Sequence, residues 1–339
     1  MRMTRGALTR PPRVFSGIQP SGDVHLGNYL GAIKRWVEGQ QAKENYFCIV
    51  DLHSLTVPQD PEILREQTRS LAALLLAAGL DPDQCALFVQ SHVSAHAEAC
   101  WLLNCVTPLG WLQRMTQYKD RAARQESVST GLLDYPALMA ADILLYDTDE
   151  VPVGEDQQQH VELARDIAER FNRLYGDLFT LPAAVIHDAV MGLDDPTVTM
   201  SKSHAHVPGH AIRMLDEPEA IRRAIARAVT DSGNEIRFSE DPARAGVANL
   251  LGIYQAITGK TADAVEADFA ATRGYGDLKR TVADVVVAEL TPIRERHETL
   301  MREPGELDRL LARGASRARA VADPKLREMK RRTGLLLPG

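Results

Sequence analysis

Strand-like and helix-like segments alternate through the first half of the chain. Apolar, β-rich runs lie at residues 13–17, 45–51 and 85–91, and a helical pattern follows each of them. A fourth short run of this kind covers residues 150–154. Strands that alternate with helices form right-handed βαβ units with parallel strands. The sequence therefore predicts an α/β fold with a parallel sheet, in which ligands bind outside the carboxyl ends of the strands.

The second half of the chain has a different pattern. After about residue 203 the segments are almost all helix-like, with few strand candidates between them. We expect a flexible tail at residues 1–13, a sheet-containing catalytic domain at 14–203 and a helical domain at 204–339. We expect the last helices of the helical domain to pack back on the catalytic domain.

Composition and charge narrow the class of protein. The chain has 339 residues, of which 45% are hydrophobic and 25% charged, as in ordinary soluble proteins. Its longest purely apolar run, Leu71 to Ala78, is too short to span a bilayer. None of its four cysteines forms a CxxC pair, which argues against a zinc ribbon or a redox motif. We expect a cytoplasmic protein without a membrane partner, and its net charge of −7 means that any nucleic acid must bind a local basic patch.

A glycine-rich turn follows the first predicted strand. Residues 15–36 read FSGIQPSGDVHLGNYLGAIKRW, with four glycines before and within the start of a helix. Glycines let backbone amides approach a phosphate closely, and a helix N-terminus offers unpaired N–H groups. His25 and Asn28 are one helical turn apart, so both can face the same anion. A capped tight turn without a ligand would explain the glycines equally well.

A second segment favours the phosphate interpretation. Residues 191–203 read MGLDDPTVTMSKS, a Gly- and Pro-containing loop. Ser201, Lys202 and Ser203 would provide one compact cation and two hydroxyls, which suits a mobile phosphate clamp.

The two segments together resemble the signatures of class I aminoacyl-tRNA synthetases. HLGN (25–28) resembles the HIGH signature, and TMSKS (199–203) resembles the KMSKS loop. The resemblance is closest to bacterial tryptophanyl-tRNA synthetases. It includes FSGIQPSG, FCIVDLHSLT, the long run from Leu132 to Asn172 and AVTDSGNEIRF, and so extends over nearly the whole chain from residue 14. It implies a Rossmann-like catalytic domain, followed by a helical domain that binds the tRNA anticodon.

The resemblance implies that the chain activates L-tryptophan with ATP and transfers it to tRNA(Trp), with Mg²⁺ carried by ATP. A carboxylate is already ionised at neutral pH, so the activation step needs no general base. It needs positioning and neutralisation of charge on the phosphates. The implied catalytic residues are His25, Asn28, Ser201, Lys202 and Ser203. The implied ATP-binding residues are Gln19, Pro20, Ser21, Gly27, Asn28, Gly154, Glu155, Asp156, Val190, Thr199, Met200, Ser201, Lys202 and Ser203.

One position departs from the family pattern. Thr199 stands where the first lysine of KMSKS is expected, so one cation is missing at the pyrophosphate. Lys119 and Arg121, in the segment QYKDR, are candidates to replace it. Losing one such contact costs about 2–4 kcal/mol of transition-state stabilisation, so the departure bears on rate more than on identity.

Recognition of a tryptophan side chain is expected to need a carboxylate. Indole presents one N–H donor and no acceptor. The resemblance assigns its recognition to Asp142, whose neighbours in MAADILLY are apolar, so we expect Asp142 to face a buried pocket. The other implied tryptophan-binding residues are Phe15, Gly17, His53, Met139, Val151, Val153 and Gln157. Gln157 is expected to bind the substrate ammonium or to orient the pocket.

The remaining features are less specific. His204, His206 and His210 have a spacing that a metal could use, but solvated loop histidines are favoured, and no metal site is predicted. Nine Lys and Arg residues between 309 and 332 form the best local footprint for an RNA backbone, although a solvated helix face explains each charge equally well. A homodimer is implied by the resemblance alone, and no DNA partner is expected.

Three alternatives stay open at this point. A tyrosyl-type synthetase shares the chemistry but needs both an acceptor and a donor for a phenol. A small HIGH-type nucleotidyltransferase would not explain the SKS segment or the long helical domain. A specialised paralogue that binds ATP or tryptophan with weak charging activity is favoured only by Thr199.

Overall fold

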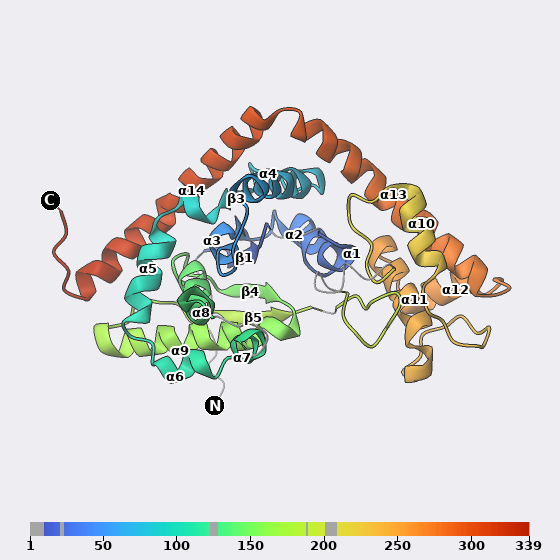
Figure 1. Ribbon diagram of the computed structural model, residues 1–339, viewed down its shortest axis with the longest axis horizontal. Coiled ribbons are helices and arrows are strands. Elements are labelled where there is room, and N and C mark those ends of the chain that lie inside the picture. The colour runs from blue at the N-terminus through green and yellow to red at the C-terminus, as the bar shows by residue number, and fades with distance from the viewer. Residues whose placement is uncertain (1–9, 21–23, 123–127, 188, 201–208, 339) are drawn as a thin grey trace.

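The fold is built on a five-stranded parallel sheet, shown in the computed structural model of Figure 1. The structure describes residues 10–20, 24–122, 128–187, 189–200 and 209–338. The strand order is β3-β2-β1-β4-β5, and every pairing is parallel. The strands are β1 (Arg13–Ile18), β2 (Glu44–Ile49), β3 (Cys85–Val89), β4 (Glu150–Val153) and β5 (Ala183–Ile186). The predicted α/β fold class is confirmed.

One strand, β5, was not predicted from the sequence. It has four residues, which are half-buried or exposed, and it pairs only with β4. A short strand at a sheet edge has little of the apolar patterning that identifies a buried strand.

Helices cover both faces of the sheet and form the C-terminal part of the chain. In the first part they are α1 (Leu26–Asn28), a π-helical turn (Tyr29–Ile33), α2 (Lys34–Gly39), α3 (Asp51–Ser54), α4 (Pro61–Ala77), α5 (Ala95–Asn104), α6 (Leu109–Gln113), α7 (Thr116–Ala122), α8 (Thr130–Leu144) and α9 (Gln158–Tyr175). The later helices are α10 (Pro218–Ala226), α11 (Ala245–Thr258), α12 (Ala262–Phe269), α13 (Tyr275–Met301) and α14 (Pro304–Arg332). Short 3-10 turns lie at Gln90–His92, Glu155–Gln157 and Pro242–Arg244.

Alternate residues of the central strands point into two different cores, as expected of a pleated sheet. Phe47 and Leu87 belong to one buried cluster, whereas Cys48 and Phe88 belong to the other. The first cluster continues into α10, α11, α12 and α13, and the second is closed by α5, α8, α9 and the later part of α14. The C-terminal helices therefore share a core with the sheet.

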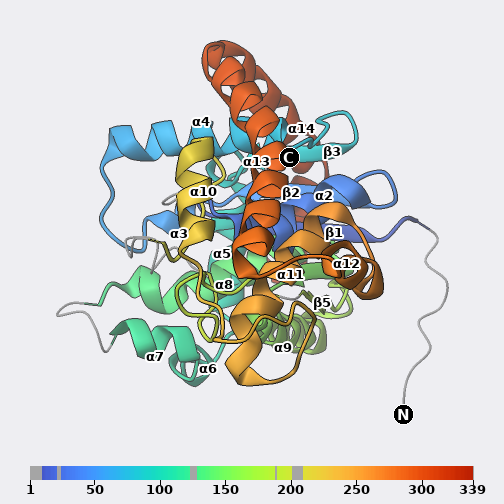
Figure 2. The ribbon, with the colours of Figure 1, turned by 90° about the vertical axis from the view of Figure 1, so that its right-hand side faces the viewer.

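Two long helices, α13 and α14, meet at the top of Figure 1 and span the molecule. Figure 2 shows α13 in front of the sheet from the side. Helix α14 crosses β3, where a Cβ on Gly314 would lie 1.8 Å from the Leu87 carbonyl oxygen. Arg317 donates to the Cys85 carbonyl over 2.9 Å. Because β3 is an edge strand with unpaired backbone groups, α14 protects an edge that could otherwise pair with another chain.

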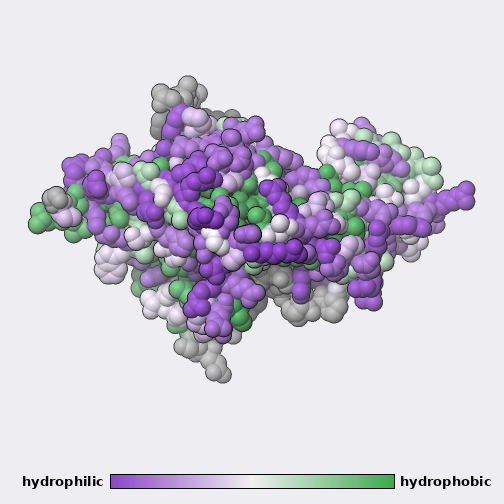
Figure 3. Space-filling model, turned by 90° about the horizontal axis from the view of Figure 1, so that it is seen from above, coloured by the Kyte–Doolittle hydropathy of each residue, from purple (hydrophilic) through white to green (hydrophobic). Residues whose placement is uncertain are grey.

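The basic residues of α14 mostly bind groups of the protein itself. Arg313 pairs with Asp83 at 3.2 Å, Lys325 with Asp147 at 2.6 Å, and Lys330 with Glu98. Further pairs join Arg309 to Glu306, and both Arg331 and Arg332 to Glu328. The view from above in Figure 3 is mainly hydrophilic. The pairs with Asp83, Asp147 and Glu98 hold α14 against the rest of the molecule, whereas the other pairs lie within α14. The RNA footprint stays a prediction.

The N-terminal segment is anchored for part of its length. Arg10 pairs with Asp149 at 2.7 Å, and Arg13, already in β1, pairs with Glu44 at 2.7 Å. The described part of the segment that we expected to be a flexible tail is therefore tied to the sheet. Among the described helices, none is long and apolar enough to cross a membrane.

Candidate active site

A cavity of about 380 Å³ opens at the carboxyl ends of β1 and β4. Every residue of the implied tryptophan set lines it, together with Gln19 and Asn28 of the implied ATP set. The remaining wall residues are Ser16, Ile18, Val50, Gln117, Tyr135, Ile143 and Pro152. The parallel sheet thus brings together side chains from β1, β4, α3, α7 and α8 at the edge where ligands of such folds bind.

One end of this cavity, which we call the closed end, is formed around Asp142 on α8. Its side chain is buried, with the residue only 1% exposed, so it is not a helix-surface acid. His53 donates to Oδ2 over 2.8 Å, while Oδ1 accepts from Gln90 Nε2 over 2.7 Å and from His96 Nδ1 over 2.6 Å. A buried charge is tolerated when it is hydrogen-bonded in this way.

The hydrogen bonds at the closed end favour the charged form of Asp142. Burial opposes ionisation, but the bonds from His53 and His96 outweigh it and hold the pKa of the Asp142 carboxyl well below its usual value. Because a carboxylate only accepts, His96 carries a proton on Nδ1. Its Nε2 lies 2.9 Å from the Tyr146 hydroxyl, whose pKa is raised by burial. Tyr146 therefore stays protonated and can donate to His96.

Sequence reasoning missed Gln90, His96 and Tyr146. Gln90 directly follows the apolar strand β3, and His96 is on the buried face of α5. A polar residue embedded in an apolar run was the available signal. Nothing local shows that Gln90 and His96, 52 and 46 residues before Asp142, meet the same carboxylate.

Another part of the cavity wall, which we call the open end, is formed by Gln117 and Gln157, both of which hydrogen-bond to the exposed Asp156 beside them. Gly154, Glu155 and Asp156 are exposed, in the turn between β4 and α9. Gln157 donates to Asp156 over 2.6 Å, and Gln117 approaches the same carboxylate at 3.4 Å. The Tyr135 hydroxyl lies 2.9 Å from Gln117 Oε1, so a chain of hydrogen bonds runs along the cavity wall. Asp156 keeps an exposed carboxylate that could accept from hydroxyl groups.

His25 and Asn28 of the glycine-rich turn bond to each other. The Asn28 N–H donates to His25 Nδ1 and the His25 N–H donates to Asn28 Oδ1, each over 3.3 Å. This reciprocal cap begins the helix at Leu26 and leaves the Asn28 amide nitrogen available as a donor beside the cavity. A Cβ on Gly27 would lie 3.0 Å from the His25 ring, so the glycine makes room for the imidazole.

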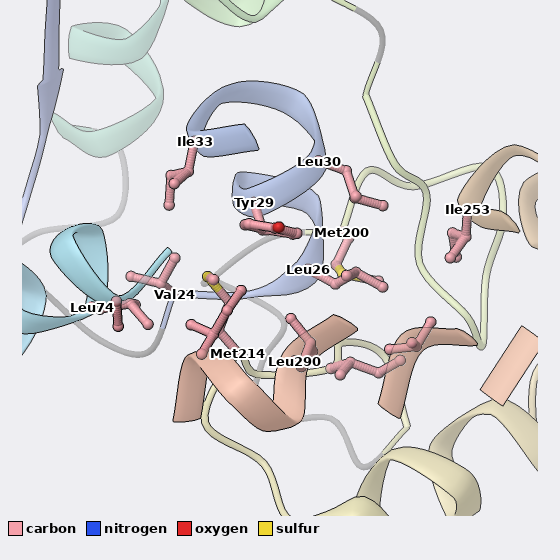
Figure 4. Packing of buried hydrophobic residues seen from close by; sticks show 14 of the residues in the cluster. Val24, Leu26, Tyr29, Leu30, Ile33, Leu74, Met200, Met214, Ile253 and Leu290 are labelled. Atoms are coloured by element: carbon pink, nitrogen blue, oxygen red, sulfur yellow. The ribbon is translucent and has the colours of Figure 1, made fainter. Parts of the chain in front are cut away.

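The two signature segments meet through Met200. Met200 is buried and packs in one cluster with Leu26, Tyr29 and Leu30, as Figure 4 shows. Its N–H donates to the Val190 carbonyl over 2.9 Å. Thr199, in contrast, is exposed, and its carbonyl lies 3.4 Å from His210 Nε2. The described start of the loop is therefore fixed against the helix that carries Asn28.

Several implied residues cannot be placed. Ser21, Ser201, Lys202, Ser203, His204 and His206 lie outside the described residues, as does the side chain of Arg121. Lys119 is exposed on α7, two residues after Gln117 of the cavity wall. Pro20 is buried and lines a second cavity of about 190 Å³, together with Gln19, residues of α4, and Arg213, Leu215 and Asp216.

The expectation for His210 was wrong. Its side chain is buried and pairs with Asp194 at 2.6 Å, and is not a solvated loop histidine. A Cβ on Gly192 would lie 2.5 Å from the His210 ring, so this glycine provides the space that the imidazole fills.

Comparisons with known proteins identify the family. The family model "tRNA synthetases class I (W and Y)" matches residues 7–291. The tryptophan–tRNA ligase of Wolinella succinogenes is 50% identical over 328 residues, covering 96% of this chain and 99% of that protein. The corresponding ligase of Listeria monocytogenes is 52% identical, covering 95% of this chain and 97% of that protein.

Solved structures show the same relation. The tryptophanyl-tRNA synthetase of Mycoplasma pneumoniae has a TM-score of 0.89 at 38% identity, covering 96% of this chain and 98% of that one. The Campylobacter jejuni enzyme, complexed with ADP and tryptophan, has a TM-score of 0.80 at 36% identity, covering 95% and 100%. With a family model that spans most of its length and such relatives over nearly all of it, the chain belongs to the class I tRNA synthetases for tryptophan and tyrosine, and within them to the tryptophanyl-tRNA synthetases.

Proposed function

We propose that this protein activates L-tryptophan with ATP, forming tryptophanyl-adenylate and pyrophosphate, and transfers the tryptophanyl group to tRNA(Trp). The observation that carries the proposal is the closed end, where an ionised and buried Asp142 lines the cavity beside the apolar side chains of Phe15, Met139 and Val151. An acceptor in such a position suits an indole N–H. The family and the full-length tryptophan–tRNA ligase relatives support the same activity.

In this proposal, the indole lies between Phe15, Met139 and the valines of β4, with its N–H donating to Asp142. Val151 is buried and Val153 is half-buried on this wall. A buried acceptor rejects an analogue without the N–H group, because the carboxylate would lose its partner. Gln157 at the open end is then placed to contact the polar part of the amino acid.

ATP would occupy the space between the open end and the glycine-rich turn. Asp156 would accept from the ribose hydroxyls, and Asn28 and His25 would donate to phosphate oxygens. The substrate carboxylate attacks the α-phosphorus, and the bond to the pyrophosphate oxygen breaks. The protein contributes orientation and donors for the charge that grows on the phosphates. Lys202, which lies outside the described residues, is the proposed cation for the leaving pyrophosphate.

We propose that Mg²⁺ enters with ATP. Among the residues that the structure describes, no group of three His, Cys, Asp or Glu side chains could hold a metal ion. Mg²⁺ commonly keeps water and substrate phosphate ligands, so it can bind with ATP without a cluster of protein side chains. Bound there, the ion would neutralise phosphate charge.

The proposals about tRNA binding and quaternary structure are based on family membership. We propose that the helical domain expected at 204–339 contacts the anticodon, and that the protein acts as a homodimer. Trp101, Leu55 and Leu109 are 68%, 59% and 57% exposed, so the surface offers large apolar side chains to a second copy. Sedimentation of wild-type protein and of Trp101→Glu would test whether Trp101 lies in such an interface.

A tyrosyl activity is the alternative within the family. The tyrosyl-tRNA synthetase of Aeropyrum pernix is only 21% identical and shows the shared fold alone. The test of the main proposal is charging of tRNA with purified protein, ATP and each amino acid. Charging of tRNA(Trp) with tryptophan is expected. Charging with tyrosine, or with neither amino acid, would overturn the proposal.

A further inference from the structure

The carboxylate at the closed end has an arrangement that sets which of its oxygens can meet a substrate. Oδ1 accepts two hydrogen bonds, from Gln90 and His96, and so both of its acceptor positions are used. Oδ2 accepts one bond, from His53, which itself lines the cavity. Within the part of the chain that the structure describes, no second donor reaches Oδ2, so one of its acceptor positions is available to a substrate.

Each of the two donors to Oδ1 is buried and has a second hydrogen bond that holds it in place. Gln90 and His96 are 0% exposed. Gln90 also accepts from the Leu52 N–H over 3.1 Å, and His96 bonds to Tyr146 over 2.9 Å. The Tyr146 ring is packed against Phe15 and Tyr46, at centroid distances of 5.4 Å and 4.6 Å. Each donor is thus fixed from behind by a second contact.

We propose that His96, held by Tyr146, is a positioning residue that determines specificity for an N–H donor by fixing the Asp142 carboxylate with Oδ2 toward the substrate. Gln90 assists from the other side of Oδ1. The inference rests on the proposed function, because it assumes that Asp142 accepts from the indole. His96 does not touch the substrate, and it acts only through the orientation and charge of Asp142.

Two substitutions at position 96 separate positioning from general damage. The side-chain nitrogen of asparagine can occupy the place of histidine Nδ1, so His96→Asn keeps a donor to Oδ1 and loses only the contact with Tyr146. His96→Leu removes both contacts. A matched control is His297→Leu, which removes another buried histidine, hydrogen-bonded to Ser70 and away from the cavity.

The measurement is tryptophan-dependent ATP–pyrophosphate exchange, compared with exchange using an analogue in which sulfur replaces the indole nitrogen. The readout is the ratio of the two kcat/KM values. His96→Leu should lower this ratio by about tenfold or more, since a hydrogen bond to a charged group is at stake. The loss should appear mainly in KM for tryptophan, because the indole contact is made in both the ground and transition states. His96→Asn should recover most of the ratio, and His297→Leu should leave it unchanged.

Other results would overturn the proposal and would show which part fails. If His96→Leu lowers exchange equally with both substrates, His96 has a structural role only. If His96→Leu does not fold, Tyr146→Phe replaces it, since this change removes the donor to His96 and should lower the ratio in the same direction; an unchanged ratio there contradicts positioning. If Asp142→Ala keeps the wild-type ratio, the assignment of Asp142 in the proposed function fails first.

Discussion

The closed and open ends of the cavity differ in how far the protein satisfies its own polar groups. At the closed end, Asp142 is almost fully buried and receives three hydrogen bonds from the protein before any substrate is present. At the open end, Asp156 is exposed, and among the described residues its carboxylate is hydrogen-bonded by Gln117 and Gln157. The group expected to choose the amino acid is thus pre-organised, whereas the groups expected to meet ATP gain partners on binding.

This difference between the two ends predicts different consequences for substitutions at each of them. A fixed, charged acceptor discriminates well, because its orientation costs nothing when the substrate arrives. An exposed group is screened by water and contributes little until the ligand displaces that water. We therefore expect substitutions at the closed end to change which amino acid reacts, and substitutions at the open end to change how ATP is used.

The largest effect should come from the phosphate side. Lys202→Ala is expected to cut tryptophan-dependent pyrophosphate exchange by about a hundredfold or more, because a charge contact that strengthens in the transition state is lost. Tryptophan affinity should fall much less. Equilibrium binding of tryptophan, measured beside exchange rates, would contradict this view if the two losses were equal.

Removing the acceptor at the closed end should have the next largest effect. Asp142→Ala leaves the indole N–H without a partner. This costs about 1–3 kcal/mol of free energy, which should appear as a lower kcat/KM for tryptophan. Asp142→Asn should do less harm, since an amide oxygen still accepts, although without the charge that strengthens the bond. ATP affinity should be unchanged in both variants. A loss of ATP affinity as large as the loss for tryptophan would break the separation of the two ends.

The hydrogen bonds of Asp142 at the closed end should also make the free energy of unfolding depend on pH in acid. The folded pKa of Asp142 is depressed, so its stabilising contribution is present above the ordinary aspartate pKa of about 3.9 and is lost as pH falls toward the folded value. Below about pH 4, the difference in the free energy of unfolding between wild type and Asp142→Asn should shrink. It should shrink by up to about 1.4 kcal/mol per pH unit. Urea unfolding of both proteins at pH 7, 5 and 3.5 measures the gap. A gap that widens in acid would mean that Asp142 is protonated in the folded protein.

A smaller effect is expected at Gln117, which joins Asp156 to Tyr135. Gln117→Leu removes a neutral hydrogen bond from Tyr135, worth about 0.5–1.5 kcal/mol, and a long hydrogen bond to the exposed Asp156 carboxylate, so KM for ATP should rise a few-fold. The kcat/KM ratio between tryptophan and its sulfur analogue should stay at the wild-type value. A changed ratio with unchanged KM for ATP would place Gln117 functionally at the closed end.

The smallest effect is expected at Thr199. Thr199 is exposed at the described start of the loop, so in Thr199→Lys a lysine can be accommodated there without rearrangement of neighbouring side chains. The exchange rate should be unchanged or raised, because the substitution adds a cation near the pyrophosphate. A large drop in rate would show that the threonine has a role of its own.

The sequence predicted the part of the molecule that local patterns encode. Four strands follow from apolar patterning, and the implied tryptophan-binding residues that line the cavity follow from the family resemblance. It did not predict β5, whose short edge position gives no clear pattern. It also did not show that Gln90 and His96 meet Asp142, since those contacts depend on how distant segments pack. Nor did it show that Arg313 and Lys325 of α14 pair with Asp83 and Asp147, because those contacts also depend on how distant segments pack.

The most direct test of the central claim is the selectivity of the wild-type protein itself. The measurement is kcat/KM in ATP–pyrophosphate exchange for L-tryptophan, L-tyrosine and the analogue with sulfur in place of the indole nitrogen. If the buried carboxylate at the closed end reads the indole N–H, tryptophan should be strongly preferred over both. A sulfur analogue that reacts as well as tryptophan would contradict the account, because it fills the same apolar walls and offers no donor to Asp142.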